Sequence, residues 1–128
     1  MSAPERFGVG LSQAADPRDA AREACGAVRA ALGGTQPTLA VMFASPDLCD
    51  DADALLAAVH DELAPRNLIG SMGEAVLGAG REIEDGPALA VWAAVLPGTE
   101  VIPFRLVARP LGEDMGVLGW PDAIADAP

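Results

Sequence analysis

The stretch Leu68-Ile69-Gly70-Ser71-Met72-Gly73-Glu74-Ala75-Val76-Leu77-Gly78-Ala79-Gly80 joins a short apolar run to a series of closely spaced glycines. Glycine adopts positive φ angles readily and lets the backbone approach a neighbour or a ligand. Ser71 and Glu74 are the polar side chains of this stretch. The pattern indicates a third strand, residues 67–70, that ends in a glycine-rich loop. Such a loop either turns the chain or holds a ligand, and the preceding segments help to decide between these two interpretations.

A strand and a helix open the chain. Residues 7–12 alternate apolar side chains with Gly8 and Gly10, which indicates a strand whose neighbour leaves no room for side chains. Asp16-Pro17 is typical of a helix start, because aspartate caps free N–H groups and proline suits the first helical position. Gly33-Gly34 ends this helix, and its apolar face is built of small side chains.

Residues 38–45 are apolar almost without interruption, which predicts a central strand covered on both faces. A second helix follows, with aspartates in its first turn, and ends at Pro65. We expect its buried stripe to contain Ala52, Leu55, Leu56, Val59 and Leu63, with His60 partly covered at its margin.

Two strand–helix–strand units in succession predict parallel strands, and ligands collect at the carboxyl ends of such strands. Three loops would open there, at residues 12–16, 45–50 and 71–74. This convergence favours a ligand site over a simple turn. The candidate ligand-binding residues are Ser45, Gly70, Ser71, Met72, Gly73 and Glu74.

The remainder of the chain predicts antiparallel strands at residues 75–83, 88–95 and 101–107, the last at a sheet edge because Pro103 cannot donate a ladder hydrogen bond. The expected fold is α/β: two βαβ units form a parallel core, antiparallel strands follow, and helices flank the mixed sheet. We expect one α/β domain over residues 1–110 and an irregular tail over residues 111–128. Trp120 would be unusual in a free tail, so either it packs back on the domain or a continuation of the chain covers it.

Composition excludes several classes of function. The formal net charge of −11 leaves no basic cluster for nucleic acid or for an anionic membrane surface. No apolar run is long enough to span a bilayer, and residues 1–10 show no signal peptide, so we expect a cytoplasmic protein with free thiols at Cys25 and Cys49. The aspartates at 47, 50, 51 and 53 lack calcium-loop spacing, so we expect a charged helix start and neither a metal nor a cofactor.

Four segments carry a resemblance to a known family through their order and spacing: Asp16-Pro17-Arg18 with its alanine-rich helix, residues 41–46, residues 68–74 and residues 80–89. Together they resemble the FIST N-terminal domain, a sensory module of bacterial signalling proteins. The resemblance implies binding of a small ligand such as an amino acid, intracellular signal transduction, and a companion C-terminal domain that this sequence lacks. It also implies a partial or truncated member. Many members carry cysteine and a small hydroxyl residue where this chain has Ser71 and Met72, which argues against thiol chemistry there.

Three functions compete at this stage. The first is a ligand-sensing module without catalysis, in which backbone amides of residues 70–73 and the hydroxyls of Ser45 and Ser71 donate to an amino acid or a similar small polar metabolite. The second is an interaction scaffold, in which the edge at residues 101–107 pairs with a partner strand or with the companion domain. The third is a hydrolase with Ser71 as nucleophile, although the G-x-S-x-G pattern is absent and the single histidine lies on a helix. An exposed edge would also favour self-association.

Overall fold

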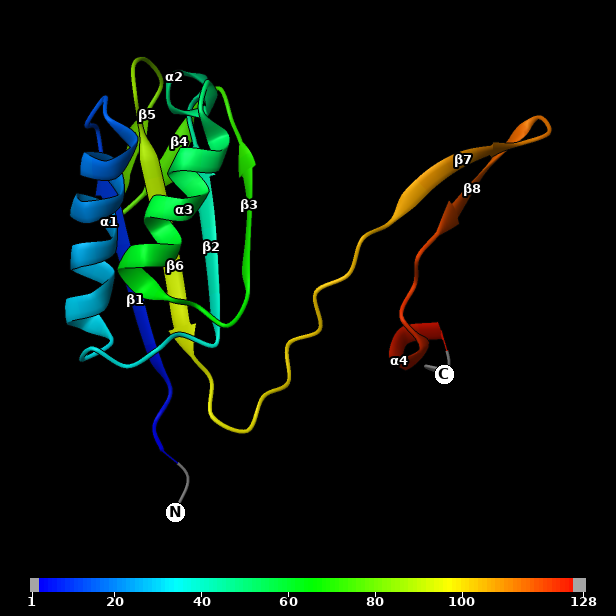
Figure 1. Cartoon of the computed structure of the whole chain (residues 1–128), viewed down its shortest axis with the longest axis horizontal. Coiled ribbons are helices and arrows are strands. Elements are labelled where there is room, and N and C mark those ends of the chain that lie inside the picture. Colours follow the sequence, from blue (N-terminus) through cyan, green and yellow to red (C-terminus); the bar gives the residue numbers. More distant parts are fainter. Residues whose placement is uncertain (1–2, 126–128) are drawn as a thin grey trace.

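The structure is a computed structural model that describes residues 3–125 (Figure 1). Its centre is a four-stranded sheet of order β1-β6-β2-β3, and two further hairpins are formed by β4 with β5 and by β7 with β8. The elements are β1 (Arg6–Ser12), α1 (Pro17–Ala31), β2 (Leu39–Ala44), α2 (Pro46–Cys49), α3 (Ala52–Leu63), β3 (Leu68–Met72), β4 (Val76–Gly78), β5 (Arg81–Ile83), β6 (Leu89–Val95), β7 (Val107–Leu111), β8 (Asp114–Leu118) and α4 (Asp122–Ala125).

The α/β fold with a mixed sheet is confirmed. Strands β2 and β3 pair in parallel, and β6 pairs antiparallel with both β1 and β2, so β1, β2 and β3 all run in one direction. The expectation that the antiparallel strands lie at the end of the sheet is wrong for β6, which occupies its middle. The crossover through α1 leaves a space between β1 and β2, and β6 fills it.

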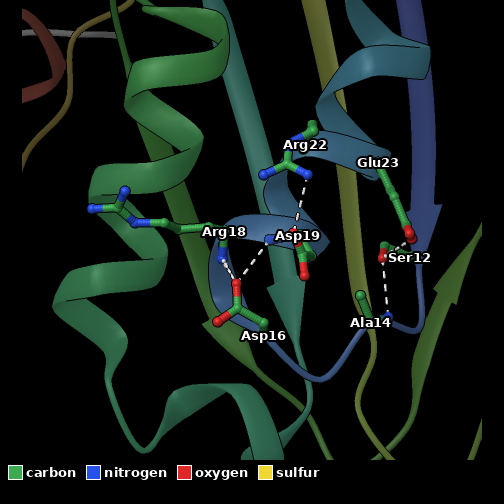
Figure 2. Close-up of polar contacts among 7 residues, drawn as sticks. All are labelled: Ser12, Ala14, Asp16, Arg18, Asp19, Arg22 and Glu23. Carbon is green, nitrogen blue, oxygen red and sulfur yellow. Dashed lines mark hydrogen bonds and ion pairs between the residues drawn. The ribbon is translucent and has the colours of Figure 1, made fainter.

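Helix α1 begins and packs as the sequence predicts. The Asp16 carboxylate accepts hydrogen bonds from the backbone N–H groups of Arg18 and Asp19, at 3.0 and 3.1 Å (Figure 2). The buried face of α1 lies directly on β1, because Gly8 and Gly10 have no side chains. A Cβ on Gly10 would lie 1.9 Å from the carbonyl oxygen of Ala24 in α1. Small residues on both elements therefore set the distance between helix and sheet.

The second helix is divided in two. Ser45-Pro46 starts the short α2, and Asp51 starts α3 by accepting from the Ala54 N–H at 3.1 Å. Leu55, Val59 and Leu63 are buried as predicted. Ala52 and Leu56 were predicted to be buried with them, but both are exposed, as is His60. The sheet that α3 covers ends at β3, so the outer margin of the helix extends beyond it.

Residues 75–83 form a hairpin and not the single predicted strand. Strands β4 and β5 pair antiparallel, and the chain reverses at Ala79-Gly80, where both residues have positive φ angles of 49° and 74°. The hairpin packs on the face of the sheet opposite the helices, where Val76 and Ile83 are buried in a small second cluster with Ala88 and Ala90.

The remainder of this second face is uncovered by the described residues, so the prediction that β2 is covered on both faces is wrong. We call the uncovered part the open sheet face. Phe7, Val9, Phe43 and Ile69 on it are each about half exposed, and Phe7 contacts Trp92 with ring centroids 6.0 Å apart. Its members are Phe7, Val9, Val41, Phe43, Ile69 and Trp92.

The predicted edge strand at residues 101–107 is also wrong, because residues 101–106 belong to no strand and β7 begins at Val107. The true edges of the sheet are β1 and β3. The segment from residue 111, predicted to be irregular, contains β8 and α4, and the predicted domain boundary falls inside β7. Residues 126–128 of the predicted tail lie outside the described residues.

Strands β7 and β8 stand apart from the body of the molecule (Figure 1), and we call residues 104–120, which contain them, the arm. Strands β7 and β8 pair over five residues each. Phe104 and Trp120 close the base of this hairpin with ring centroids 5.9 Å apart. Trp120 therefore packs against a neighbour in the chain, yet half of its surface stays exposed.

Candidate functional site

A groove of about 250 Å³ lies between β3 and the helical segment α2–α3, and we call it the β3 groove. Gly70, Ser71 and Met72 of the predicted site form its strand wall. The helical wall includes the two residues that were expected in the core, Ala52 and Leu56. The complete lining is Met42, Ala44, Cys49, Ala52, Leu55, Leu56, Gly70, Ser71 and Met72.

Gly70 shapes the floor of this groove. It pairs with Met42 across the parallel ladder, and a Cβ at this position would lie 2.5 Å from the Met42 carbonyl oxygen and 2.6 Å from the Met42 side chain. Because residue 70 has no side chain, the Met42 side chain can occupy the floor and the groove stays open above it. Any larger residue at position 70 would collide with β2.

Beside Gly70, the backbone of β3 presents N–H and C=O groups that pair with no neighbouring strand among the described residues. Along a parallel ladder, alternate residues direct both N–H and C=O toward one neighbouring strand. The Asn67 carbonyl accepts from Ala40 and the Gly73 N–H donates to Ala44, so the odd-numbered residues face β2. The N–H and C=O groups of Gly70 and Met72 therefore face away from β2, at an edge with no partner strand among residues 3–125. The β3 groove combines apolar walls with this row of backbone donors and acceptors.

Ser71 and Met72 belong to β3 and not to the loop that the sequence predicts, because the strand extends two residues further than expected. The Ser71 hydroxyl donates to the neighbouring Met72 carbonyl at 3.1 Å. A carbonyl oxygen cannot remove the hydroxyl proton, and activation of a serine nucleophile needs an adjacent base. This contact gives Ser71 no help as a nucleophile.

The other predicted site residues have structural positions. Ser45 is buried, and its hydroxyl accepts from the Ala88 N–H at 2.9 Å, which ties α2 to the start of β6. It does not line the β3 groove, so the prediction that its hydroxyl donates to the same ligand as Ser71 has no support. The Gly73 N–H donates to the Ala44 carbonyl at 3.0 Å and holds the end of β3. Glu74 is exposed in the following bend.

The first predicted loop is fixed to its own helix. Ser12 is buried, and its hydroxyl donates to the Glu23 carboxylate at 2.6 Å while it accepts from the Ala14 N–H at 3.1 Å (Figure 2). Strand β6 lies between β1 and β2 and separates this loop from the loops that follow β2 and β3. The prediction that three loops converge is therefore wrong for this loop, and only the loops after β2 and β3 lie at neighbouring strand ends.

The two cysteines are free, as predicted, and differ in environment. The pKa of the Cys25 thiol is raised from 9.0 to about 12, chiefly by burial and secondly by the charge of Glu62, while Arg29 acts in the opposite direction. Cys49 lies at the β3 groove, where partial burial and then Asp50 raise its thiol pKa. Both thiols therefore stay protonated near neutral pH, a state that is unreactive toward electrophiles.

Within residues 3–125, no group of three or more metal-ligating side chains is close enough to hold an ion. Asp51, one of the clustered aspartates, accepts a hydrogen bond as the cap of α3. In the same described part of the chain, no helix has both the length and the apolar character needed to cross a membrane.

No protein-family model matches the chain. An uncharacterized protein of Mycobacterium tuberculosis is 43% identical over 102 residues, which are 80% of this chain and 27% of that protein. An uncharacterized protein of Mycobacterium bovis is 42% identical over 89 residues, which are 70% of this chain and 23% of that protein. The chain spans about a quarter of the length of the curated relatives it matches.

Sequence reasoning missed the helical wall of the groove. The sequence predicts a strand at Met42, a helix at Cys49 and a core position at Leu56, and the apolar character of these residues fits those positions equally well. The spacing of the α3 stripe held no signal of the groove, because Leu55 and Leu56 together fit the ordinary width of one buried helix face. Only the limited extent of the sheet leaves Leu56 at its margin, where it lines the groove.

Proposed function

We propose that this chain is a small-ligand-binding domain without catalytic activity of its own, and that its ligand is an amino acid with an apolar side chain. The β3 groove is the observation that carries the proposal. Its walls are apolar, and it has room for a side chain of the size of leucine or methionine. It also contains three of the six ligand-binding residues that the sequence predicts. Concave apolar sites with a few polar groups are the usual form of a small-molecule site.

The polar end of an amino acid has partners at the edge of the groove. An ammonium group can donate to the outward C=O groups of Gly70 and Met72, and a carboxylate can accept from their N–H groups. A strand that adds to a sheet edge makes the same backbone hydrogen bonds, and here a single amino acid makes them. An apolar side chain then enters the groove between Met42 and Leu56.

Charge narrows the ligand class further. No lysine or arginine lines the groove, and Asp50 and Asp51 lie in sequence between its lining residues Cys49 and Ala52. Acidic neighbours favour an ammonium group and oppose an additional negative charge. The ligand is therefore an apolar amino acid or a related amine rather than an acidic metabolite.

The resemblance to FIST N-terminal domains supplies the setting of this proposal. In that setting the domain acts as a sensor in cytoplasmic signal transduction, and a companion C-terminal domain responds when the ligand binds. The matched relatives are about four times longer than the region they share with this chain, which leaves room for such a companion in those proteins.

The scaffold hypothesis loses its predicted edge at residues 101–107, which is not a strand of the sheet, but the unpaired edge of β3 supports a scaffold at a different place. An extended peptide that adds to this edge could insert alternate side chains in the same groove. The scaffold hypothesis and the first proposal use the same site, but the ligand is an extended peptide in one and a single amino acid in the other.

The test is a thermal-shift series with leucine, methionine, serine and glutamate. We expect leucine and methionine to raise the unfolding temperature, because a ligand at about 100 times its dissociation constant adds about 2.7 kcal/mol of stability. Serine and glutamate should have little effect.

Two variants on α3 assign the effect to the groove. Leu56→Asp introduces a charge into the groove wall at a half-exposed position, where the fold tolerates it. Ala57→Asp introduces the same charge at the next residue, which is exposed and does not line the groove. Leucine should stabilise Ala57→Asp as much as the unmodified chain and should not stabilise Leu56→Asp. Equal stabilisation of both variants would refute the proposed site.

A further inference from the structure

The open sheet face is a second surface, separate from the β3 groove. Phe7, Val9, Phe43 and Ile69 leave about 400 Å² of apolar area exposed there. No charged residue lies among the members of this face. An apolar area of about 400 Å² is comparable to the largest such patch on a typical monomer, and a patch of that kind is often functional.

The arm carries a matching surface. Alternation along β7 and β8 places Ala108, Pro110, Met115 and Val117 on one face of the hairpin, where Ala108 pairs with Val117 and Pro110 with Met115. All four are exposed and uncharged. A two-stranded hairpin without further packing is only marginally stable in water, so this face needs a partner.

We propose that two copies of this chain exchange arms, so that the arm of each copy covers the open sheet face of the other. Residues 101–104 run beside Leu39 and Ile69, where they enclose a groove of about 240 Å³. From there the chain passes beyond β3 and carries the arm away from its own sheet (Figure 1). The exchange is symmetric, because each copy provides one arm and receives one.

The area is sufficient for a stable dimer. An arm that covers a sheet face of about 400 Å² loses about as much of its own area, so two such contacts bury about 1,600 Å² in total, which is the size of a standard specific interface.

The charge distribution also permits this contact. The arm contains two arginines, Arg105 and Arg109, and two acids, Glu113 and Asp114, so its net charge is zero. Most of the excess negative charge lies elsewhere on the chain and outside the contact. Repulsion between the two acidic bodies remains, and salt screens it beyond about 8 Å at physiological ionic strength. Dimerisation should therefore strengthen as salt is added.

Sedimentation velocity of the full chain tests the exchange. The unmodified chain should be dimeric. Val9→Asp on the sheet face and Val117→Asp on the arm change residues of nearly equal exposure, 45% and 46%. Each variant should raise the dimer dissociation constant by about 100-fold or more, because each buries an unpaired charge. Ala27→Asp adds the same charge at an exposed position of α1 and should leave the dimer intact.

A mixture distinguishes exchange from other contacts. Val9→Asp retains a normal arm and Val117→Asp retains a normal sheet face, so the two variants together should form a mixed dimer at concentrations where each alone is monomeric. Circular dichroism of each variant controls for folding. A monomeric unmodified chain, a Val117→Asp variant that still dimerises, or a mixture that stays monomeric at the highest concentration would each overturn the proposal.

Discussion

The contact between β1 and α1 gives the sharpest test of the fold. Gly10 faces α1 so closely that a Cβ would lie 1.9 Å from the Ala24 carbonyl oxygen and 2.7 Å from the Ala24 carbonyl carbon. Contacts below 3.0 Å are essentially never observed for a real Cβ atom. The obstacle is helix backbone and cannot move by a side-chain rotation, so Gly10→Ala has to displace α1 from the sheet.

The expected loss follows from this geometry. Overpacking a core by one methyl group typically costs about 1–3 kcal/mol. Since α1 carries a large share of the core on its buried face, we expect Gly10→Ala to lose about 3 kcal/mol of unfolding free energy. Gly8→Ala should lose less, about 1–2 kcal/mol, because its Cβ would lie 2.9 Å from the Val28 carbonyl oxygen.

Gly26→Ala is the matched control. Gly26 lies in α1, and a Cβ there would meet no atom within 4 Å. The substitution should stabilise the chain by about 0.5–1 kcal/mol, because alanine is the better helix former. Urea unfolding followed by far-UV circular dichroism measures all three variants. If Gly10→Ala were as stable as Gly26→Ala, the close contact between β1 and α1 would be refuted.

Two further predictions concern α1. Asp16→Ala removes the acceptor for the Arg18 and Asp19 N–H groups and should lose about 1 kcal/mol in the same urea assay; an unchanged midpoint would contradict the cap. The pKa of the Cys25 thiol is raised from 9.0 to about 12 in the folded chain, so unfolding releases a proton at high pH and stability should fall as pH rises from 9 toward 12. The slope is at most about 1.4 kcal/mol per pH unit. Cys25→Ala should lose this part of the pH dependence, and an identical pH profile for both chains would show that Cys25 is not its source.

The sequence predicted helices and strands well where a residue type acts through its immediate neighbours in the chain. Asp16-Pro17 and Gly33-Gly34 set the limits of α1, because capping and positive φ angles depend on neighbours along the chain. Gly8 and Gly10 correctly predicted a close neighbour. The covered strand at residues 88–95 is β6.

Strand order could not be predicted in the same way. The position of β6 between β1 and β2 depends on contacts between residues that are far apart in the sequence, such as Val9 with Trp92 and Val41 with Trp92. An apolar run predicts a buried strand in any position of the sheet. The same limitation affected the site: β6 separates the loop at residue 12 from Ser71, and the Ser45 hydroxyl is bonded to Ala88 at the start of β6.

The apolar residues of the arm show a second limit. Val107 and Leu111 lie on one face of the hairpin and Val117 lies on the other, as in a strand covered on both faces, yet all three are exposed. Periodicity identifies which residues share a face, but it does not identify what covers that face. Only the arrangement in space shows that the arm and the open sheet face are both uncovered among the described residues.

The central claim is that the β3 groove binds an apolar amino acid, and a nuclear magnetic resonance titration of the full chain with leucine tests it most directly. The claim predicts saturable shifts of the backbone amide signals of Gly70 and Met72 and of residues around Leu56, with the amides of α1 unchanged. Glutamate at the same concentrations should leave these signals in place. Shifts confined to another part of the chain, or no shifts from a folded protein, would contradict it.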